Sequence, residues 1–216
     1  MIQEHKEEYE KKSYILPHSF DSRLYPKEES EKKDKIRITY VGHLDEIRSP
    51  RPFLEALKEL KDEDSEIKQK LIVEFYGSMA DSDKVYIINE ELTDIVRIRK
   101  PVTYQESLKI MMNSDWLLMI DADISSIVKE NIFFAAKLAD YIGTGKQIFG
   151  ITMPQGITAD ILYNINAVKT SFCIEEIKNY LWLIIYKKYY PDINVDYQKQ
   201  YDCKNIGKNL DELMKY

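Results

Sequence analysis

A lysine and an aspartate, Lys137 and Asp140, lie three residues apart within Ile132–Gly156. Apolar residues recur at helical spacing in the first part of this segment, which contains the pair. Residues three apart share one face of a helix, so the two side chains would project together. A cation and a carboxylate near a helix N-terminus suit a phosphate and a sugar hydroxyl, respectively. The spacing alone favours a plain surface ion pair, because such pairs are common and contribute little to stability.

The segment Gly42–Pro52 (GHLDEIRSPRP) joins an expected strand to an expected helix and carries two arginines. It is neither a G-x-G-x-x-G fingerprint nor a P-loop, so it does not support a generic dinucleotide or ATP site. The forked donors of Arg48 and Arg51 are suited to clamping a diphosphate. Solvated side chains at a helix start are an equally good interpretation, and we expect Arg51 to be the more solvated of the two.

Asp121 and Asp123 follow the apolar segment Trp116–Ile120. A D-x-D pair can hold a divalent cation that bridges a nucleotide diphosphate. A polar cap that closes a strand is the favoured interpretation. Three scattered histidines and two cysteines without ligand spacing give no further reason to expect a metal or a cofactor. No nucleophile motif is present, so no catalytic residue is assigned.

The chain has 216 residues, of which 44% are hydrophobic, so it can bury a core of one domain with or without appendages. A net charge of −6 argues against nucleic-acid binding. The polar N-terminus does not resemble a secretory signal, and unpaired cysteines suit a cytoplasmic protein. The apolar, aromatic and then basic segment Tyr180–Tyr190 indicates either a helix packed on the sheet, which is favoured, or a peripheral contact on the cytoplasmic face of a membrane.

From Ile36 onward, short apolar segments alternate with segments of helical periodicity. Strands are expected at 36–41, 71–76, 95–98, 116–120, 147–151 and 167–173, with helices at 51–61, 83–92, 104–113, 158–163, 175–187 and 196–214 and around Lys137. This alternation favours an α/β fold with a doubly wound, Rossmann-like parallel sheet. Ligands of such sheets bind beyond the carboxyl ends of the strands, which makes loops 42–52, 77–83, 100–105 and 121–136 the candidates.

Residues 1–34 differ from this regular pattern. Two charge-dense runs, 4–12 and 27–35, flank an apolar and aromatic island at Tyr14–Tyr25. Charge runs are usually solvated. The island is either a strand remnant or an arm that docks elsewhere.

Four runs in chain order resemble the donor-nucleotide domain of GT-B glycosyltransferases, most closely family 4 of the group 1 type. They are YVGHLDEIRSPRPFLEALKEL, LIVEFYGSM, VTYQESLKIMMNSDWLLMID and NIFFAAKLADYIGTGKQIFGIT, and together they cover roughly 36–163. The resemblance implies one half of a GT-B fold. It also implies an interdomain linker or remnant at 1–34, a nucleotide-sugar-binding domain at 35–173 and C-terminal helices at 174–216.

The same resemblance assigns donor-binding roles. Gly42 would let the backbone approach the phosphates, Arg48 and Lys137 would neutralise the diphosphate, and Asp140 would bind the ribose hydroxyls. The loop with Pro101, Val102 and Tyr104 would border the base. The loop with Asn131, Phe133 and Phe134 would face the transferred sugar and the diphosphate.

Several positions depart from the family pattern. Eight residues before Asp140, where the family has a sugar-contacting glutamate, this chain has Ile132. Asp140 itself is one methylene shorter than the family's second glutamate. Ser49 stands where a basic residue is expected, and Gln147 where a proline is usual. Donor binding therefore carries over, whereas the rule for contacting the sugar does not.

By this resemblance the protein would transfer a hexosyl group from a UDP- or GDP-linked sugar to an acceptor, with retention and without a metal. The acceptor would belong to cell-surface polysaccharide or glycoconjugate assembly. A GT-B enzyme has two such domains, so we expect a C-terminal half that is inactive without an N-terminal acceptor domain, in cis or in trans. The alternative is a non-catalytic module of the same fold. A GT-B-like sugar-phosphate epimerase is disfavoured, because clustered histidines and acids are missing.

Overall fold

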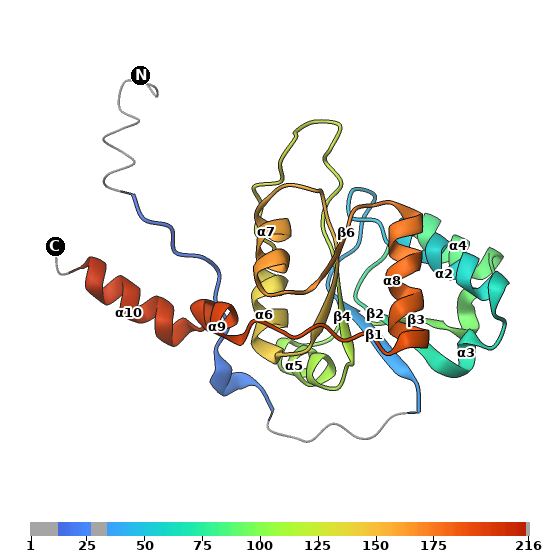
Figure 1. Cartoon of the computed structure of the whole chain (residues 1–216), viewed down its shortest axis with the longest axis horizontal. Coiled ribbons are helices and arrows are strands. Elements are labelled where there is room, and N and C mark those ends of the chain that lie inside the picture. The colour runs from blue at the N-terminus through green and yellow to red at the C-terminus, as the bar shows by residue number, and fades with distance from the viewer. Residues whose placement is uncertain (1–12, 27–33, 215–216) are drawn as a thin grey trace.

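Six parallel strands form one sheet in the order β3-β2-β1-β4-β5-β6 (Figure 1). In this computed structural model, which describes residues 13–26 and 34–214, the two charge-dense runs fall almost entirely outside the described residues. The strands are β1 (Ile36–Val41), β2 (Leu71–Tyr76), β3 (Val96–Arg99), β4 (Trp116–Ile120), β5 (Gln147–Ile151) and β6 (Val168–Thr170). The expected doubly wound α/β fold is confirmed, and the expected bounds of β1, β2, β4 and β5 are those of the structure.

Helices cover both faces of the sheet (Figure 1). One face carries α2 (Arg51–Glu63), α3 (Ile67–Lys70), α4 (Asp81–Asn89) and α8 (Ile174–Lys187), and the other carries α5 (Tyr104–Met112), α6 (Ala136–Thr144) and α7 (Ile157–Asn164). The chain then continues through α9 (Val195–Gln198) to α10 (Cys203–Leu213). Short 3-10 turns lie at Ser22–Leu24, Leu92–Asp94 and Lys199–Tyr201. Because both faces are covered, the central strands are apolar throughout.

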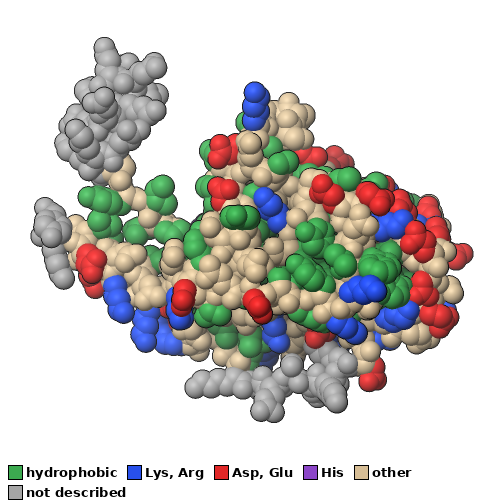
Figure 2. Space-filling model, in the orientation of Figure 1, with side chains coloured by type: hydrophobic (Ala, Val, Ile, Leu, Met, Phe, Trp, Pro, Cys, Tyr) green, Lys and Arg blue, Asp and Glu red, His purple; other side chains and the backbone are tan. Residues whose placement is uncertain are grey.

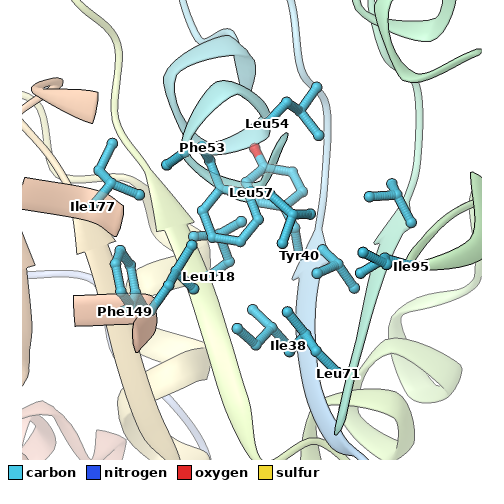
Figure 3. Close-up of a cluster of buried hydrophobic side chains, with 14 of the residues drawn as sticks. Ile38, Tyr40, Phe53, Leu54, Leu57, Leu71, Ile95, Leu118, Phe149 and Ile177 are labelled. Carbon is cyan, nitrogen blue, oxygen red and sulfur yellow. The ribbon is translucent and has the colours of Figure 1, made fainter. Parts of the chain in front are cut away.

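The larger core lies between the sheet and the α2–α8 layer (Figure 3). Phe53 and Leu57 of α2 and Ile177 of α8 are fully buried there against Leu118 and Phe149 of the sheet. Each such side chain contributes about 1.5–3 kcal/mol through the apolar surface it removes from water. The segment Tyr180–Tyr190 lies mostly within this layer as part of α8, as the favoured interpretation expected.

The apolar island before β1 is an arm that docks on the α5–α6–α7 layer. Phe20 is buried, its amide donates to the Tyr201 carbonyl at 3.0 Å, and its carbonyl accepts from the Cys203 amide at 2.8 Å. Gly143 of α6 makes room for the arm, since a Cβ there would lie 2.6 Å from the Phe20 ring and 2.3 Å from the Tyr25 hydroxyl. The arm therefore rests directly on the helix that carries Lys137 and Asp140.

Most expected helices differ from those of the structure by one to three residues at one or both ends, and two differ further. The helix expected at 196–214 is broken, because Asp202 is extended and its carboxylate accepts from the Lys204 amide to begin α10. The helix carrying Lys137 begins at Ala136, because Asn131 pairs with Gly156 in an isolated bridge and the segment between stays irregular. Lys137 is therefore in the first turn of α6.

The strand exits of β1 and β2 touch backbone to backbone. The Gly42 amide donates to the Tyr76 carbonyl at 2.9 Å. Gly77 has a φ of +135°, and a Cβ on it would lie 2.0 Å from the Gly42 carbonyl oxygen. Glycine is needed at position 77 for both reasons, since other residues rarely adopt this backbone conformation.

Replacing Gly77 with alanine should destabilise the fold by roughly 1–3 kcal/mol for the backbone conformation, with the clash adding to this. Gly207→Ala is the matched control, because nothing lies within 4 Å of its Cβ position and it sits inside α10. That control should be neutral or slightly stabilising. Urea unfolding of both variants measures the difference, and equal stabilities would contradict the close approach.

Candidate functional site

The candidate site lies where the strand order reverses. After β1 the chain crosses towards β2, and after β4 it crosses towards β5, so the loops that follow these paired strands diverge and leave a crevice. The N-terminus of α6, with its free amides and positive dipole end, belongs to the loop after β4. Such a crevice is where open α/β sheets bind ligands.

Lys137 reaches from α6 across the crevice to β1. Its Nζ hydrogen-bonds the Tyr40 hydroxyl and lies 4.0 Å from the centroid of the Tyr40 ring. A Cβ at Gly42 would lie 2.8 Å from this Nζ, so the glycine leaves space for the ammonium group. The structure contains no ion pair between Lys137 and Asp140, so the surface-pair interpretation is wrong.

The Lys137 ammonium is placed where its charge is costly. Burial, and then the positive charge of Arg48, lower the pKa of Lys137 to about 7, against the opposing effects of Asp121 and Asp45. An anion bound between the two cations would remove this cost, since an opposite charge favours the protonated amine. The local field therefore favours an anionic ligand.

Arg48 lies in the loop after β1 and contributes the second cation. Its amide donates to an Asp45 carboxylate oxygen at 2.7 Å, which fixes the turn. Its Nε is buried and has no hydrogen-bond partner among the described residues. A buried donor left unpaired costs about 1–3 kcal/mol, which a ligand oxygen would relieve.

Arg51 has a different role from the one expected. Its Nε and one terminal nitrogen each lie 2.9 Å from a carboxylate oxygen of buried Asp83, and its guanidinium lies 4.1 Å from the centroid of the Tyr86 ring. Ser49 also donates to Asp83, at 3.0 Å. The expectation of a solvated Arg51 is wrong, because the start of α2 packs against α4 and buries the carboxylate that Arg51 neutralises.

A cavity of about 220 Å³ opens at the carboxyl ends of β1, β2 and β3. It is lined by Val41, Gly42, His43, Tyr76, Gly77, Ser78, Pro101 and Val102. Three of the four candidate loops therefore converge, as parallel pairing requires. Val102 and Gly42 line the same cavity, and the His43 ring contacts the Ser78 hydroxyl at its rim.

Asp140 is half-buried on α6 and is held by two tyrosines. The Tyr104 hydroxyl donates to Asp140 Oδ1 at 2.9 Å, and the Tyr25 hydroxyl donates to the Asp140 backbone carbonyl at 2.9 Å. Burial raises the pKa of Asp140, whereas the hydrogen bond from Tyr104 and the nearby Tyr25 hydroxyl oppose the increase. The periodicity predicts that Tyr104 begins a helix, but nothing local indicates that its hydroxyl reaches α6.

Asn131 is oriented into the protein. Its side chain is 1% exposed, donates to Asp121 Oδ2 at 2.9 Å and accepts from the Phe133 amide at 3.0 Å. Asp121 is also buried, whereas Asp123 is exposed and bonds Ser125, so the D-x-D residues do not act together. Asp121 caps β4, as the favoured interpretation expected. The described residues contain no group of three or more acids, histidines or cysteines suited to a metal.

The two phenylalanines of this loop, Phe133 and Phe134, lie in different environments. Phe133 is 67% exposed. Phe134 packs on His18 and Tyr201, with ring centroids 5.5 and 5.9 Å apart, and lines an apolar cavity of about 620 Å³ beside the arm. The structure thus brings Gly42, Arg48 and Lys137 together, and it places Phe134 in a different cavity from Val102.

No family model matches the sequence, and no curated protein matches it. Solved structures match the fold at low identity. They include the pneumococcal O-GlcNAc transferase GtfA in complex with UDP and GlcNAc, at 16% identity, a TM-score of 0.60, and coverage of 98% of this chain and 43% of GtfA. Anabaena HepE in complex with UDP-glucose matches at 13% identity with a TM-score of 0.68, over 94% of this chain and 57% of HepE.

A glycosyltransferase from Rickettsia africae matches at 13% identity with a TM-score of 0.68, over 99% of this chain and 61% of that enzyme. The chain is one half of a GT-B fold. It spans about half the length of the structures that it matches. The fold of this chain is thus shared with these proteins.

Lys137→Met should stabilise the free protein at neutral and acidic pH. The unfolded chain keeps the Lys137 proton up to pH 10.5 and the folded chain only to about 7, so the wild-type free energy of unfolding rises with pH between these values. The advantage of the variant should be largest below about pH 7 and shrink above it. Urea unfolding from about pH 6 to pH 9.5 measures this. A constant difference across that range would contradict the assignment.

Proposed function

We propose that this chain binds the nucleotide diphosphate of a sugar donor, as the donor half of a glycosyltransferase. The observation that carries the proposal is the meeting of Lys137, Arg48 and Gly42 at the crevice where the strand order reverses. Neither cation forms an ion pair with a carboxylate in the part of the chain that the structure describes, and the Arg48 Nε has no hydrogen-bond partner there. Together with the space left by Gly42, they form a site that a polyanion can approach closely. The cavity that contains Val102 then borders the nucleoside.

The proposed chemistry is transfer of a hexosyl group to an acceptor hydroxyl. As the glycosidic bond breaks, negative charge develops on the departing diphosphate. Lys137, Arg48 and the α6 N-terminus would stabilise that charge electrostatically, without proton transfer. Residues 35–173 would provide this donor site, and Phe133 would face the sugar. Asn131 would act indirectly, by holding the loop against Asp121.

A second domain would supply the acceptor site, in cis or in trans, because the chain spans only 43–61% of the three structures described above. The proposed acceptor is a cell-surface polysaccharide or glycoconjugate precursor on the cytoplasmic side of a membrane. Retention of configuration also belongs to this proposal. Residues 1–34 and the part of 174–216 that follows α8 would connect the two domains.

One surface supports peripheral contact with a membrane. Trp182, Tyr189 and Tyr190 are about two-fifths exposed, and Lys187 and Lys188 lie between them in sequence. Figure 2 shows hydrophobic side chains beside basic ones over α8. Aromatic rings and lysines are the residues that lie at membrane interfaces. No described helix has the length and apolar character to cross a membrane.

A non-catalytic donor-binding module is the second candidate. Ile132, at the place of the sugar-contacting glutamate, is 65% exposed and offers no hydrogen bond from its side chain. A catalytic protein would hydrolyse or transfer the donor sugar, if slowly. A module would bind the nucleotide diphosphate with no turnover, even when combined with an acceptor domain.

Calorimetric titration with UDP, GDP and UDP-linked sugars tests the proposal. Binding of at least one nucleoside diphosphate, with the nucleoside alone binding much more weakly, is expected. Absence of binding to all of them at about 1 mM, which corresponds to less than about 4 kcal/mol of affinity, would contradict it.

Lys137→Ala should weaken binding of the nucleoside diphosphate by roughly ten- to a hundredfold, because a charge-assisted contact of about 1.5–3 kcal/mol is lost. Nucleoside binding should change little. Calorimetry with both ligands measures the two effects separately. An equal loss for both would indicate a general structural change instead of a phosphate contact.

The two arginines should respond in opposite ways. Arg48→Ala should reduce diphosphate affinity most strongly at low salt, because ions screen the attraction. Arg51→Ala should leave the affinity of the folded protein unchanged but destabilise the fold, because buried Asp83 loses its partner. Calorimetry at two salt concentrations measures the diphosphate affinity of both variants, and urea unfolding measures their stability. A larger loss of affinity for Arg51→Ala would show that the phosphate assignment is reversed.

A further inference from the structure

The Asp140 carboxylate has one oxygen engaged and one available. Oδ1 accepts from the Tyr104 hydroxyl, and the nearby Tyr25 hydroxyl donates to the Asp140 backbone carbonyl, so no hydrogen bond to Oδ2 forms among the described residues. The side chain is half-buried, one helical turn after Lys137. A carboxylate oxygen accepts more than one hydrogen bond, so Oδ2 is free to accept from a ligand hydroxyl.

Hydrogen bonds at the start of α5 fix the backbone of Tyr104. It is the first residue of α5, directly after a capping box in which the Thr103 hydroxyl accepts from the Glu106 amide and Glu106 accepts from the Thr103 amide at 2.9 Å. The Ser107 hydroxyl donates to the Tyr104 carbonyl at 2.6 Å. The tyrosine thus extends from a fixed helix start towards α6, while half of its side chain stays exposed.

The hydrogen bond from Tyr104 restricts rotation of the Asp140 carboxylate. An unrestrained carboxylate rotates about its terminal bond, because the torsion angle of that bond has a broad and roughly two-fold distribution. A hydrogen bond to one oxygen removes that freedom before a ligand arrives, and preorganisation of this kind increases affinity. The Tyr25 hydroxyl restrains the Asp140 backbone from the arm, so both ends of the residue are fixed.

We propose that Tyr104 is a positioning residue that orients Asp140 Oδ2 towards the ribose, so that the site selects ribonucleoside over 2′-deoxyribonucleoside diphosphates. This inference rests on the proposed function, because it deepens the same donor site. Tyr104 does not contact the ribose itself. Its effect passes through the carboxylate, which makes the effect conditional on Asp140.

The test measures the affinities of UDP and 2′-deoxy-UDP for the wild type, Tyr104→Phe, Asp140→Ala and the double variant. Wild type should prefer UDP by roughly fivefold or more, because the deoxy ligand leaves the carboxylate unpaired. Tyr104→Phe should lower UDP affinity by roughly two- to tenfold and leave 2′-deoxy-UDP nearly unchanged. In the Asp140→Ala background, Tyr104→Phe should have no further effect.

Tyr163→Phe is the matched control, because Tyr163 is 75% exposed near the end of α7 and its hydroxyl has no hydrogen bond among the described residues. It should leave both affinities unchanged. Thermal unfolding of Tyr104→Phe checks that the variant remains folded at the titration temperature.

Three results would overturn the inference: equal losses for both ligands, no change, or tighter UDP binding when the hydroxyl is removed. The last would mean that Tyr104 occupies the place of the ribose. Each can occur while wild type still binds UDP in a Lys137-dependent way, which would leave the proposed function intact. Absence of all nucleotide binding to wild type would contradict both proposals.

Discussion

The parallel pairing of β1 with β4 at the centre of the sheet is the constraint on which the site depends. Ile38 and Thr39 of β1 pair with Trp116 and Leu117 of β4, which aligns the two carboxyl ends. Because the chain leaves these ends in opposite directions, no loop bridges them, and the first turn of α6 faces the exit of β1. Lys137 can then reach Tyr40 and Gly42 across the crevice. Weakening this pairing would separate Lys137 from Gly42 and Arg48, which both follow β1.

Electrostatics at this crevice oppose the stability of the free protein. The half-buried Lys137 ammonium lies beside a second cation, Arg48, whose buried Nε has no partner within residues 13–26 and 34–214. A purely structural core would avoid this arrangement. The neighbouring Arg51 shows the contrast, since its guanidinium is neutralised by Asp83 and stacks on an aromatic ring. Two arginines three residues apart therefore have different environments: Arg48 lies at the proposed diphosphate site, and Arg51 joins α2 to α4. Perturbed ionisation of this kind is characteristic of functional sites.

The docked arm links the site to the rest of the protein. Phe20 and Tyr25 rest on α6 over Gly143, and Phe20 also pairs with the backbone before α10. The same helix carries Lys137 on the crevice and Asp140 against Tyr104. Segments that lie near opposite ends of the chain thus stabilise one short helix from outside, while Tyr104 stabilises it from the α5 side. A nine-residue helix depends on such packing, because isolated helices of this length are marginal in water.

The sequence by itself determined the fold class, most strand bounds and the four candidate loops, three of which line one cavity, because apolar periodicity and strand–helix alternation are local signals that the parallel sheet preserves. Gly42, Arg48 and Lys137 were singled out by the resemblance of the surrounding motifs to GT-B donor domains, which also depends on local sequence. Only the tertiary structure decided which partners these residues have. Arg51 meets a carboxylate 32 positions away, Tyr104 meets one 36 positions away, and Asn131 is oriented inward by a bridge to Gly156. Such contacts depend on how separate elements pack, and no periodicity or spacing within a single element encodes them.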